Sequence, residues 1–256
     1  DDSDLAVSSL NYAVELHRVS HCADKPETCA ELTSTFSTSR TPTVLAYSPD
    51  GYTLAVGMQN GKIELHDLAG CGQGKSESCG TLLKTFTQHK SKINALEFSP
   101  DGALLASASN DQTSRVWRLN SGVNASTFLH KGSVKAVAFS PDGRLIFTAG
   151  QDKTIRVWQV SSFAVIAYLT GHTGTVTGLA PSPDLKTLVS ASRDGSLHLW
   201  DLSTRKSLAA NQDYNAPLQT LRAADSGDIL AAGTTEGVVQ LYRLAECDQP
   251  DSTCGI

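Results

Sequence analysis

Residues 134–160 read VKAVAFSPDGRLIFTAGQDKTIRVWQV, and this stretch decides the fold because the chain repeats it. Residues 93–119, INALEFSPDGALLASASNDQTSRVWRL, match it at 13 of 27 positions without a gap. Further copies lie at residues 176–202, 44–68 and 218–244, and the second half of a copy lies at residues 5–19. The repeat length is 41 or 42 residues between Trp117, Trp158 and Trp200. Self-similarity at such a period indicates a repeat architecture.

Each unit is predicted to contain four short β-strands. In residues 134–170, an apolar run at 137–139 meets Pro-Asp-Gly, which is turn chemistry. A second strand is expected at 145–149, a tight turn at 151–153, and a third strand after it in which apolar and polar residues alternate. The run at 163–169 is expected to be the fourth strand. Because no segment shows the 3.6-residue period of a long helix, the sequence predicts an all-β fold.

The repeated unit resembles the WD-repeat β-propellers. Gly171-His172 before a strand, Asp194 in a turn and Trp200-Asp201 at the end of the third strand carry the resemblance. It covers essentially the whole chain and is most specific in the three central units. It implies one β-propeller domain over residues 1–256 with about six four-stranded blades. The expected blade parts are residues 1–36, 40–87, 89–130, 131–170, 172–210 and 214–256.

The two outer units are expected to be incomplete. With an offset of 49, Asp1 aligns with Asp50, so the first unit would lack its first strand. Cys254 aligns with Cys79, so the last unit would stop as its fourth strand begins. We therefore expect a segment of a longer polypeptide whose full ring has seven blades, the commonest number in this family.

A histidine, an aspartate and a tryptophan recur at fixed spacing in the three central units. Histidine-carboxylate pairs near serines can indicate catalysis, but an active site is needed once, whereas a packing solution is needed in every blade. The resemblance implies that each set forms a buried hydrogen-bonded chain with a strand Ser or Thr. The sets are His89, Asp111 and Trp117; His130, Asp152 and Trp158; and His172, Asp194 and Trp200.

The outer units carry other residues at the same positions. These are Asn11 and His17, Asn60 and His66, and Glu236 and Tyr242. We interpret His17 and His66 as packing substitutes rather than metal ligands, because no recognised zinc-ligand spacing is present. The sequence predicts no catalytic residue, no metal site and no cofactor.

The six cysteines form three local pairs, each just after a third strand. Three disulfides would require an oxidising compartment; a metal site, which needs about four converging ligands, and reduced thiols are the alternatives. The disulfide reading favours an extracytoplasmic location, periplasmic or secreted, with the cytoplasm as the alternative. The pairs are Cys22 with Cys29, Cys71 with Cys79, and Cys247 with Cys254.

Composition limits the partners. The chain has 21 basic and 26 acidic residues, a net charge of −5, which argues against a nucleic-acid binder. Its longest apolar run, residues 163–169, is far shorter than the roughly 20 residues that span a membrane. The resemblance implies a non-catalytic scaffold or sensor that docks a protein or peptide with an acidic surface, alongside other domains of the same polypeptide.

The resemblance also indicates a docking face, on the side of the His-bearing loops. Its candidate residues are Lys92, Asn110, Lys135, Gln151 and Arg193, with Lys90 and Lys131 nearby; Lys135 and Arg193 are expected to be exposed. The alternatives are a hydrolase or lyase with its site in the propeller channel and a purely structural spacer. The expected channel-facing ends of the first strands are not catalytic residue types: Val44, Ile93, Val134 and Val176.

Overall fold

The computed structural model describes residues 3–9, 11–19, 30–71, 79–211, 216–224 and 229–243. In this part of the chain every regular element is a β-strand, and the strands form six antiparallel sheets. The first three sheets are β1 (Ser3–Ser8), β2 (Ala13–Val19) and β3 (Ala30–Ser37); β4 (Pro42–Tyr47), β5 (Thr53–Met58), β6 (Ile63–Asp67) and β7 (Thr81–Phe86); and β8 (Ile93–Phe98), β9 (Leu104–Ser109), β10 (Thr113–Arg118) and β11 (Val123–Leu129).

The remaining three sheets continue this pattern along the chain. They are β12 (Val134–Phe139), β13 (Leu145–Gly150), β14 (Thr154–Gln159) and β15 (Val165–Thr170); β16 (Val176–Pro181), β17 (Thr187–Ser192), β18 (Leu197–Asp201) and β19 (Lys206–Asn211); and β20 (Leu218–Ala223), β21 (Ile229–Thr234) and β22 (Val239–Arg243). The all-β β-propeller prediction is therefore confirmed.

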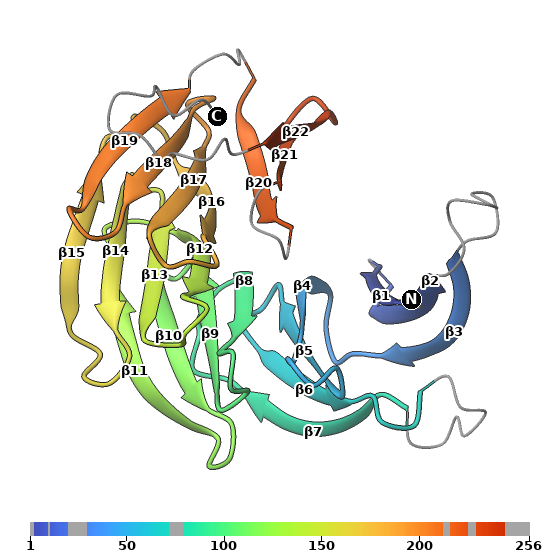
Figure 1. Ribbon diagram of the computed structural model, residues 1–256. Helices are drawn as coiled ribbons and strands as arrows, with labels where there is room; N and C mark the ends of the chain where they lie inside the picture. Colours follow the sequence, from blue (N-terminus) through green and yellow to red (C-terminus); the bar gives the residue numbers. More distant parts are fainter. Residues whose placement is uncertain are drawn as a thin grey trace.

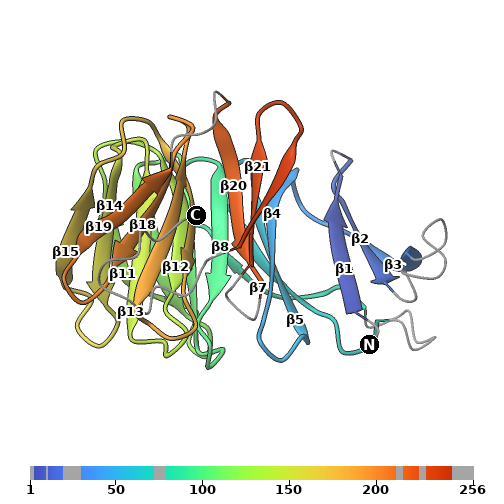
Figure 2. The ribbon, with the colours of Figure 1, turned by 45° about the horizontal axis from the view of Figure 1, so that its top comes forward.

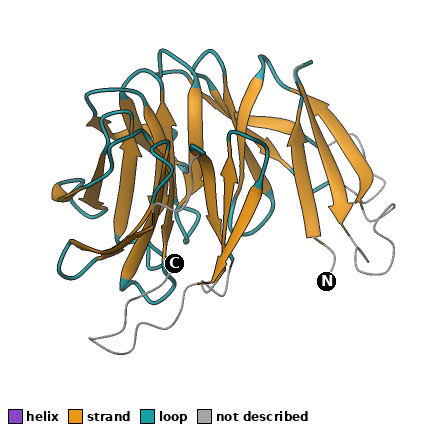
Figure 3. Ribbon diagram, turned by 90° about the horizontal axis from the view of Figure 1, so that it is seen from above, coloured by secondary structure: helices purple, strands orange, loops and turns teal. Residues whose placement is uncertain are grey.

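The six sheets are blades arranged around a central axis (Figure 1). Within each blade the strands follow one another outward in chain order, so β4, β8, β12, β16 and β20 lie innermost (Figure 1). The blade β1–β3 and the blade β20–β22 stand at the two ends of the arc (Figures 1 and 2). Seen from above, strands and short loops account for the whole described chain (Figure 3).

The apolar core lies between neighbouring blades. One cluster joins Phe147 and Leu169 of the blade β12–β15 to Val176, Leu188 and Trp200 of the next blade. Similar clusters occupy the other blade interfaces. Each blade is therefore stabilised by the burial of apolar area against its neighbours.

Every blade from β4 onward has a β-bulge near the start of its innermost strand. In β12 the register shifts between Val134 and Ala136, and the other four inner strands shift at the same place. A bulge leaves one residue unpaired and re-aims its side chain. We call the second residues of these strands the bulge residues; they are Thr43, Asn94, Lys135, Thr177 and Gln219.

The bulges correct the expectation about the channel. Ile93, Val134 and Val176 precede the bulge residues and are fully buried in the core between blades rather than facing the channel. Of the four predicted channel-facing residues, Val44 lines the channel cavity. The bulge turns the next side chain toward the channel, which a simple two-residue alternation does not anticipate.

The Ser-Pro-Asp-Gly turns form as their chemistry predicts. In the turn after β12, Asp142 accepts hydrogen bonds from the Ser140 hydroxyl at 2.5 Å and the Arg144 amide at 3.0 Å. Gly143 has φ +69°, where glycine avoids the steric cost of a side chain. In the blade β16–β19 the same position holds Leu185 at φ +63°.

Two strand predictions need correction or completion. Phe163 is not in the fourth strand of its blade: it lies in the turn at φ +54°, and β15 begins at Val165. The first blade has three strands, as expected. The last blade has three strands among the described residues, and its expected fourth strand falls outside them.

Candidate interaction face and channel mouth

The fold places the loops of the propeller on two opposite faces. We call one the histidine face: it carries the connections between blades, which hold His89, His130 and His172, and the turns between second and third strands. The opposite face carries the other turns of each blade, among them the β12–β13 and β14–β15 turns. The predicted docking residues all belong to the histidine face or to the mouth of the channel on that side.

The first His-Asp-Trp set forms one continuous hydrogen-bonded chain. The Trp117 indole N–H donates to the Ser107 hydroxyl at 2.9 Å, and that oxygen lies 2.8 Å from Nε2 of His89. Nδ1 of His89 lies 2.8 Å from Oδ2 of Asp111. Since a carboxylate only accepts, the ring proton lies on Nδ1 and the Ser107 hydroxyl donates to Nε2. The chain ties the inter-blade loop to the second and third strands.

Burial and hydrogen bonding set the protonation states of His89 and Asp111. Burial lowers the pKa of His89, and the hydrogen bond to Asp111 opposes that effect only in part. Burial alone would raise the pKa of Asp111, but hydrogen bonds from His89, Thr113 and the Lys90 amide outweigh it and hold that pKa well below its usual range. A neutral imidazole therefore donates to an ionised carboxylate, an arrangement suited to architecture.

In the other two sets, a hydroxyl of the second strand again links the tryptophan to the histidine. The Trp158 indole donates to the Thr148 hydroxyl at 2.8 Å, which lies 2.9 Å from Nε2 of His130. The Trp200 indole donates to Ser190 at 2.8 Å, and His172 Nε2 lies 2.7 Å from the same oxygen. The histidine-to-aspartate distances are longer, 3.3 Å from His130 to Asp152 and 3.4 Å from His172 to Asp194.

A third-strand arginine explains the longer distance in the second set. Nη1 of Arg156 lies 2.7 Å from Asp152 Oδ2 and 2.7 Å from His130 Nδ1. A guanidinium can only donate, so His130 Nδ1 accepts and its ring proton lies on Nε2, facing Thr148. In the third set the Ser196 hydroxyl lies 3.0 Å from His172 Nδ1 and donates to Asp194 at 2.5 Å. Arg156, four residues after Asp152, was not among the residues predicted for this set.

The outer histidines contact neighbouring groups of their own blades. His66 is buried; its Nδ1 lies 2.8 Å from the Gly80 carbonyl and its Nε2 lies 3.2 Å from Glu64. His17 is less buried, with Nε2 3.4 Å from Glu15. Asn60 caps its turn by accepting from the Lys62 amide at 3.1 Å. In the described residues, no group of three or more His, Cys, Asp or Glu side chains is arranged to hold a metal ion.

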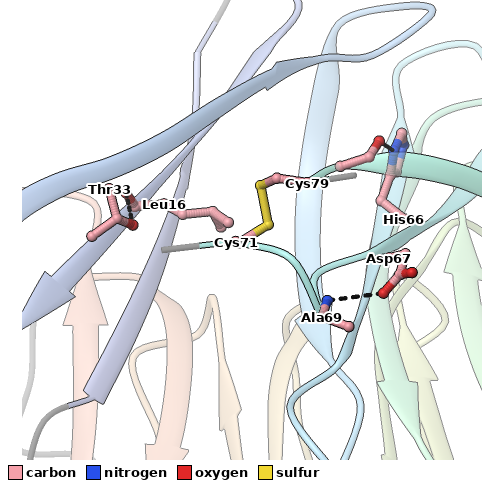
Figure 4. The surroundings of a disulfide bond; sticks show 8 residues. Leu16, Thr33, His66, Asp67, Ala69, Cys71 and Cys79 are labelled. Carbon is pink, nitrogen blue, oxygen red and sulfur yellow. Dashed lines mark hydrogen bonds between the residues drawn. A yellow bond between two sulfur atoms is a disulfide. The ribbon is translucent and has the colours of Figure 1, made fainter. Parts of the chain in front are cut away.

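One cysteine pair forms a disulfide on the opposite face. Cys71 and Cys79 are bonded within the β6–β7 hairpin, with Cα atoms 4.7 Å apart (Figure 4). Both cysteines pack against the cluster that joins the first two blades, which contains Leu16 (Figure 4). The predicted pairs Cys22–Cys29 and Cys247–Cys254 lie outside the described residues.

A cavity of about 270 Å³ occupies the channel at the level of the bulge residues. Four cationic side chains line it, and the described lining includes no carboxylate. The cations are Lys92, Lys135, Arg193 and Arg222. Around them the inner strands contribute small residues, among them Ala95, Ala136 and Gly178.

Three bulge residues bond one blade to the next at this level. The Thr43 hydroxyl donates to the Ile93 carbonyl at 2.7 Å. In the same way Asn94 donates to the Val134 carbonyl at 2.7 Å, and Thr177 to the Leu218 carbonyl at 2.9 Å. The sequence carries no common signal for these residues, because their side chains differ and only the bulge gives them one role.

Lys135 departs from this arrangement. Its Nζ turns back to the preceding blade and lies 2.6 Å from Oδ1 of Asn110. Burial lowers the pKa of Lys135, and the positive charges of Arg193 and Lys92 lower it further. Lys135 is thus half-buried rather than exposed as expected, because the bulge directs it into the channel mouth.

The structure brings four of the five predicted docking residues together. Lys92, Lys135 and Arg193 line one cavity, and Asn110 accepts from Lys135 and from Asn94. Arg193 is exposed and donates to Gln219 at 3.2 Å. Gln151 is exposed on the histidine face, outside the cavity lining, where its side chain accepts from the Ser133 amide at 3.4 Å.

Farther along the described inner strands, Glu97 lies deeper than the bulge residues. The fifth residues of the five inner strands include three alanines, together with Glu97 of β8 and Arg222 of β20. Glu97 accepts a hydrogen bond from the Phe139 amide at 2.9 Å. Burial raises the pKa of Glu97 to about 7, opposed by that hydrogen bond and by the positive charge of Arg222.

The opposite face has a wider cleft between two blades. It measures about 600 Å³ and is bordered by the turns at Pro49-Asp50 and Pro100-Asp101, with Leu83 exposed at its side. Lys84 reaches across it to donate to the Leu119 carbonyl at 2.8 Å. The turns at its rim recur in the other blades, so their presence reflects blade construction. Within the described ranges, no helix is long and apolar enough to cross a membrane.

Comparison with known sequences agrees with this geometry. The family profile described as "WD domain, G-beta repeat" matches residues 80–118, 122–159 and 163–201. The mouse WD repeat-containing protein 1 is 34% identical over 90 residues, which cover 35% of this chain and 14% of that protein. The Arabidopsis thaliana periodic tryptophan protein 2 is 33% identical over 84 residues, covering 33% of this chain and 8% of that protein.

A human relative has a composite name. The WD repeat and SOCS box-containing protein 1 is 37% identical over 79 residues, covering 30% of this chain and 17% of that protein. The matches thus span less than a fifth of each of these relatives. Each matched repeat contains one complete His-Asp-Trp set, so the chain carries three WD repeats within its six-bladed β-propeller.

Proposed function

We propose that this propeller is a non-catalytic scaffold that docks an acidic protein or peptide on its histidine face. The observation that carries the proposal is the channel mouth, where Lys92, Lys135 and Arg193 line one cavity whose described lining holds no carboxylate. The whole chain has a net charge of −5, so this positive charge is segregated from the average surface. Segregated charge steers a partner of opposite sign and selects against partners of like sign.

An enzyme in the channel is the rival from another class. General acid-base chemistry needs a titratable group within reach of a substrate proton. Glu97 is the channel carboxylate with a raised pKa, and its carboxylate already accepts from a backbone amide. The three histidines are tied into the repeated architectural sets. These engagements favour binding over catalysis.

The relatives support a role beside other domains. A human relative is named for WD repeats together with a SOCS box, and the match covers 17% of it. We infer that this propeller likewise acts as the binding part of a larger polypeptide. Its rigid blades would present the loops of the histidine face to the partner.

The test compares two charge-matched double variants of the full-length protein. Lys135→Thr with Arg193→Thr removes two charges from the channel mouth. Lys186→Thr with Lys206→Thr removes two exposed charges from the opposite face. Partners are isolated by affinity purification and quantified by mass spectrometry. The proposal expects a partner to be lost with the first variant and kept with the second; equal retention by both contradicts it.

We also propose that the chain folds in an oxidising compartment, periplasmic or secreted. The Cys71–Cys79 disulfide supports this, since structural disulfides persist where thiols are not kept reduced. Alkylation of the native protein inside cells, before lysis, tests it. Full labelling of both thiols would place the protein in a reducing compartment.

A further inference from the structure

We propose that the channel mouth is a binding site for one phosphoryl-type oxyanion, held by Lys135 together with Lys92 and Arg193. This inference rests on the proposed acidic partner and deepens it, because it names the chemical group that enters the channel. Its starting point is Lys135, whose side chain bonds to the preceding blade, whereas Thr43, Asn94 and Thr177 donate to the next one.

The ring makes Lys135 unusual on structural grounds. Thr43, Asn94 and Thr177 each donate from the bulge to a carbonyl of the next blade. Lys135 occupies the equivalent place in β12 but turns to Asn110 and away from the next blade. A threonine there could make the inter-blade bond found at positions 43 and 177. The lysine therefore supplies a charge that the architecture of the ring does not require.

Among the described residues that line the cavity with Lys135, the charged side chains are all positive. Lys92 and Arg193 line the same cavity and lower its pKa, which means that the three cations repel one another. Lys135 meets the carbonyl oxygen of Asn110, a neutral acceptor, and Arg193 meets the neutral Gln219. The site thus holds cations with neutral partners, and a bound anion would relieve their repulsion.

The number of cations favours a phosphoryl group over a single carboxylate. A carboxylate brings one negative charge, whereas a phosphoryl group brings about −1.5 to −2 and three strong acceptor oxygens. An ammonium has three donors and a guanidinium has five. Lys135 gives one donor to Asn110 at 2.6 Å and one to Asn94 at 3.5 Å, and Arg193 gives one to Gln219 at 3.2 Å, so both cations keep donors for the anion.

The shape of the channel limits where the anion can lie. The cavity of about 270 Å³ accommodates a group of phosphate size. Glu97 stands three residues farther along its strand than the bulge residue Asn94, roughly 10 Å deeper at the usual rise per residue. Arg222 shares the level of Glu97, so groups of both signs meet there, whereas the mouth holds Lys92, Lys135 and Arg193 and is the place that we assign to the oxyanion.

Isothermal titration with inorganic phosphate at constant ionic strength tests the site. The chain offers a matched variant, Lys135→Thr, which installs the side chain found at positions 43 and 177. Lys186→Thr is the control for loss of one charge. We expect one phosphate to bind the unaltered protein and the control alike, and Lys135→Thr to weaken binding at least tenfold. Thermal unfolding of each variant verifies that it is folded.

Peptides identify the source of the oxyanion. A peptide with one phosphoserine should bind more tightly than the same peptide with glutamate, and inorganic phosphate should compete with it. If inorganic phosphate binds and the phosphopeptide does not, the natural ligand of the same site is a free anion.

The outcomes separate the two proposals. Absent phosphate binding, or equal binding by Lys135→Thr, overturns the oxyanion site even if an acidic partner still needs the histidine face in the co-purification test. Specific phosphate binding without partner loss in that test overturns the docking function and leaves the site standing.

Discussion

The ammonium group of Lys135 lies 2.6 Å from Oδ1 of Asn110, so a side chain of one inner strand is tied to a turn of the preceding blade. The acceptor is neutral, and the lysine keeps its charge at the channel mouth. Asn110 also accepts from Asn94 at 2.8 Å. One short polar network therefore positions the charge that we propose as the centre of recognition.

Replacing Asp111 by alanine should destabilise the propeller. The carboxylate accepts hydrogen bonds from His89, from the Lys90 amide and from the Thr113 amide. Alanine would leave these donors without that acceptor. The free energy of unfolding should fall by about 1–3 kcal/mol, measured by denaturant titration. Glu236→Ala is the control, because Glu236 holds the equivalent position in the last blade but is exposed. Equal losses in both variants would show that Asp111 has no special role.

Glu97 should make stability depend on pH. Burial raises its folded pKa to about 7 from an ordinary value of 4.5, so the folded state keeps a proton that the unfolded state releases. Its contribution is fully present below pH 4.5 and is lost as pH rises toward about 7. Glu97→Gln keeps an acceptor for the Phe139 amide and should remove this loss. Unfolding midpoints of both proteins between pH 4.5 and 8 measure the difference; parallel curves would refute the assignment.

Replacing Leu185 by glycine should stabilise the protein. Its φ of +63° is the conformation that Gly143 adopts in the equivalent turn, and it costs an L-residue about 1–2 kcal/mol. Leu185→Gly should raise the unfolding free energy by about 1 kcal/mol, reduced by the greater freedom of glycine in the unfolded chain. The reverse change, Gly143→Leu, should lower it. Destabilisation by Leu185→Gly would mean that its side-chain contacts outweigh the backbone strain.

The Cys71–Cys79 disulfide should contribute to stability through a short loop. A disulfide of this loop length is worth about 2–3 kcal/mol, and this one also packs against the interface of the first two blades. Changing both cysteines to serine should lower the unfolding free energy by that order, and reductant should then have no further effect through this pair. Peptide mapping without reduction should recover the two cysteines linked. Separate peptides would contradict the bond.

The sequence predicted the repeated parts of the molecule because repetition carries its own evidence. His89, Asp111 and Trp117 share their spacing with two other sets, so their common role could be inferred before any geometry was known. The turn chemistry of Ser-Pro-Asp-Gly gave the strand boundaries in the same way. Phe163 was misplaced because its left-handed backbone ends the turn and no glycine marks it.

The channel mouth could be predicted only in part. Lys92, Lys135 and Arg193 were identified as members of one face, but the bulges that direct side chains into the channel leave no common residue type at positions 43, 94, 135, 177 and 219. Glu97 and Arg222 lie 125 positions apart in the chain and share a level only because their blades surround one axis. Such relations depend on ring geometry rather than on local pattern.

Site-specific photo-crosslinking tests the docking face most directly. A benzophenone amino acid is placed at Gln151, exposed on the histidine face, or at Lys186, exposed on the opposite face, in the full-length protein in its own cells. Our account predicts a crosslinked macromolecular partner from position 151 that is absent from position 186 and is lost when Lys135→Thr and Arg193→Thr are added. A partner crosslinked from position 186 and not from position 151 would contradict it.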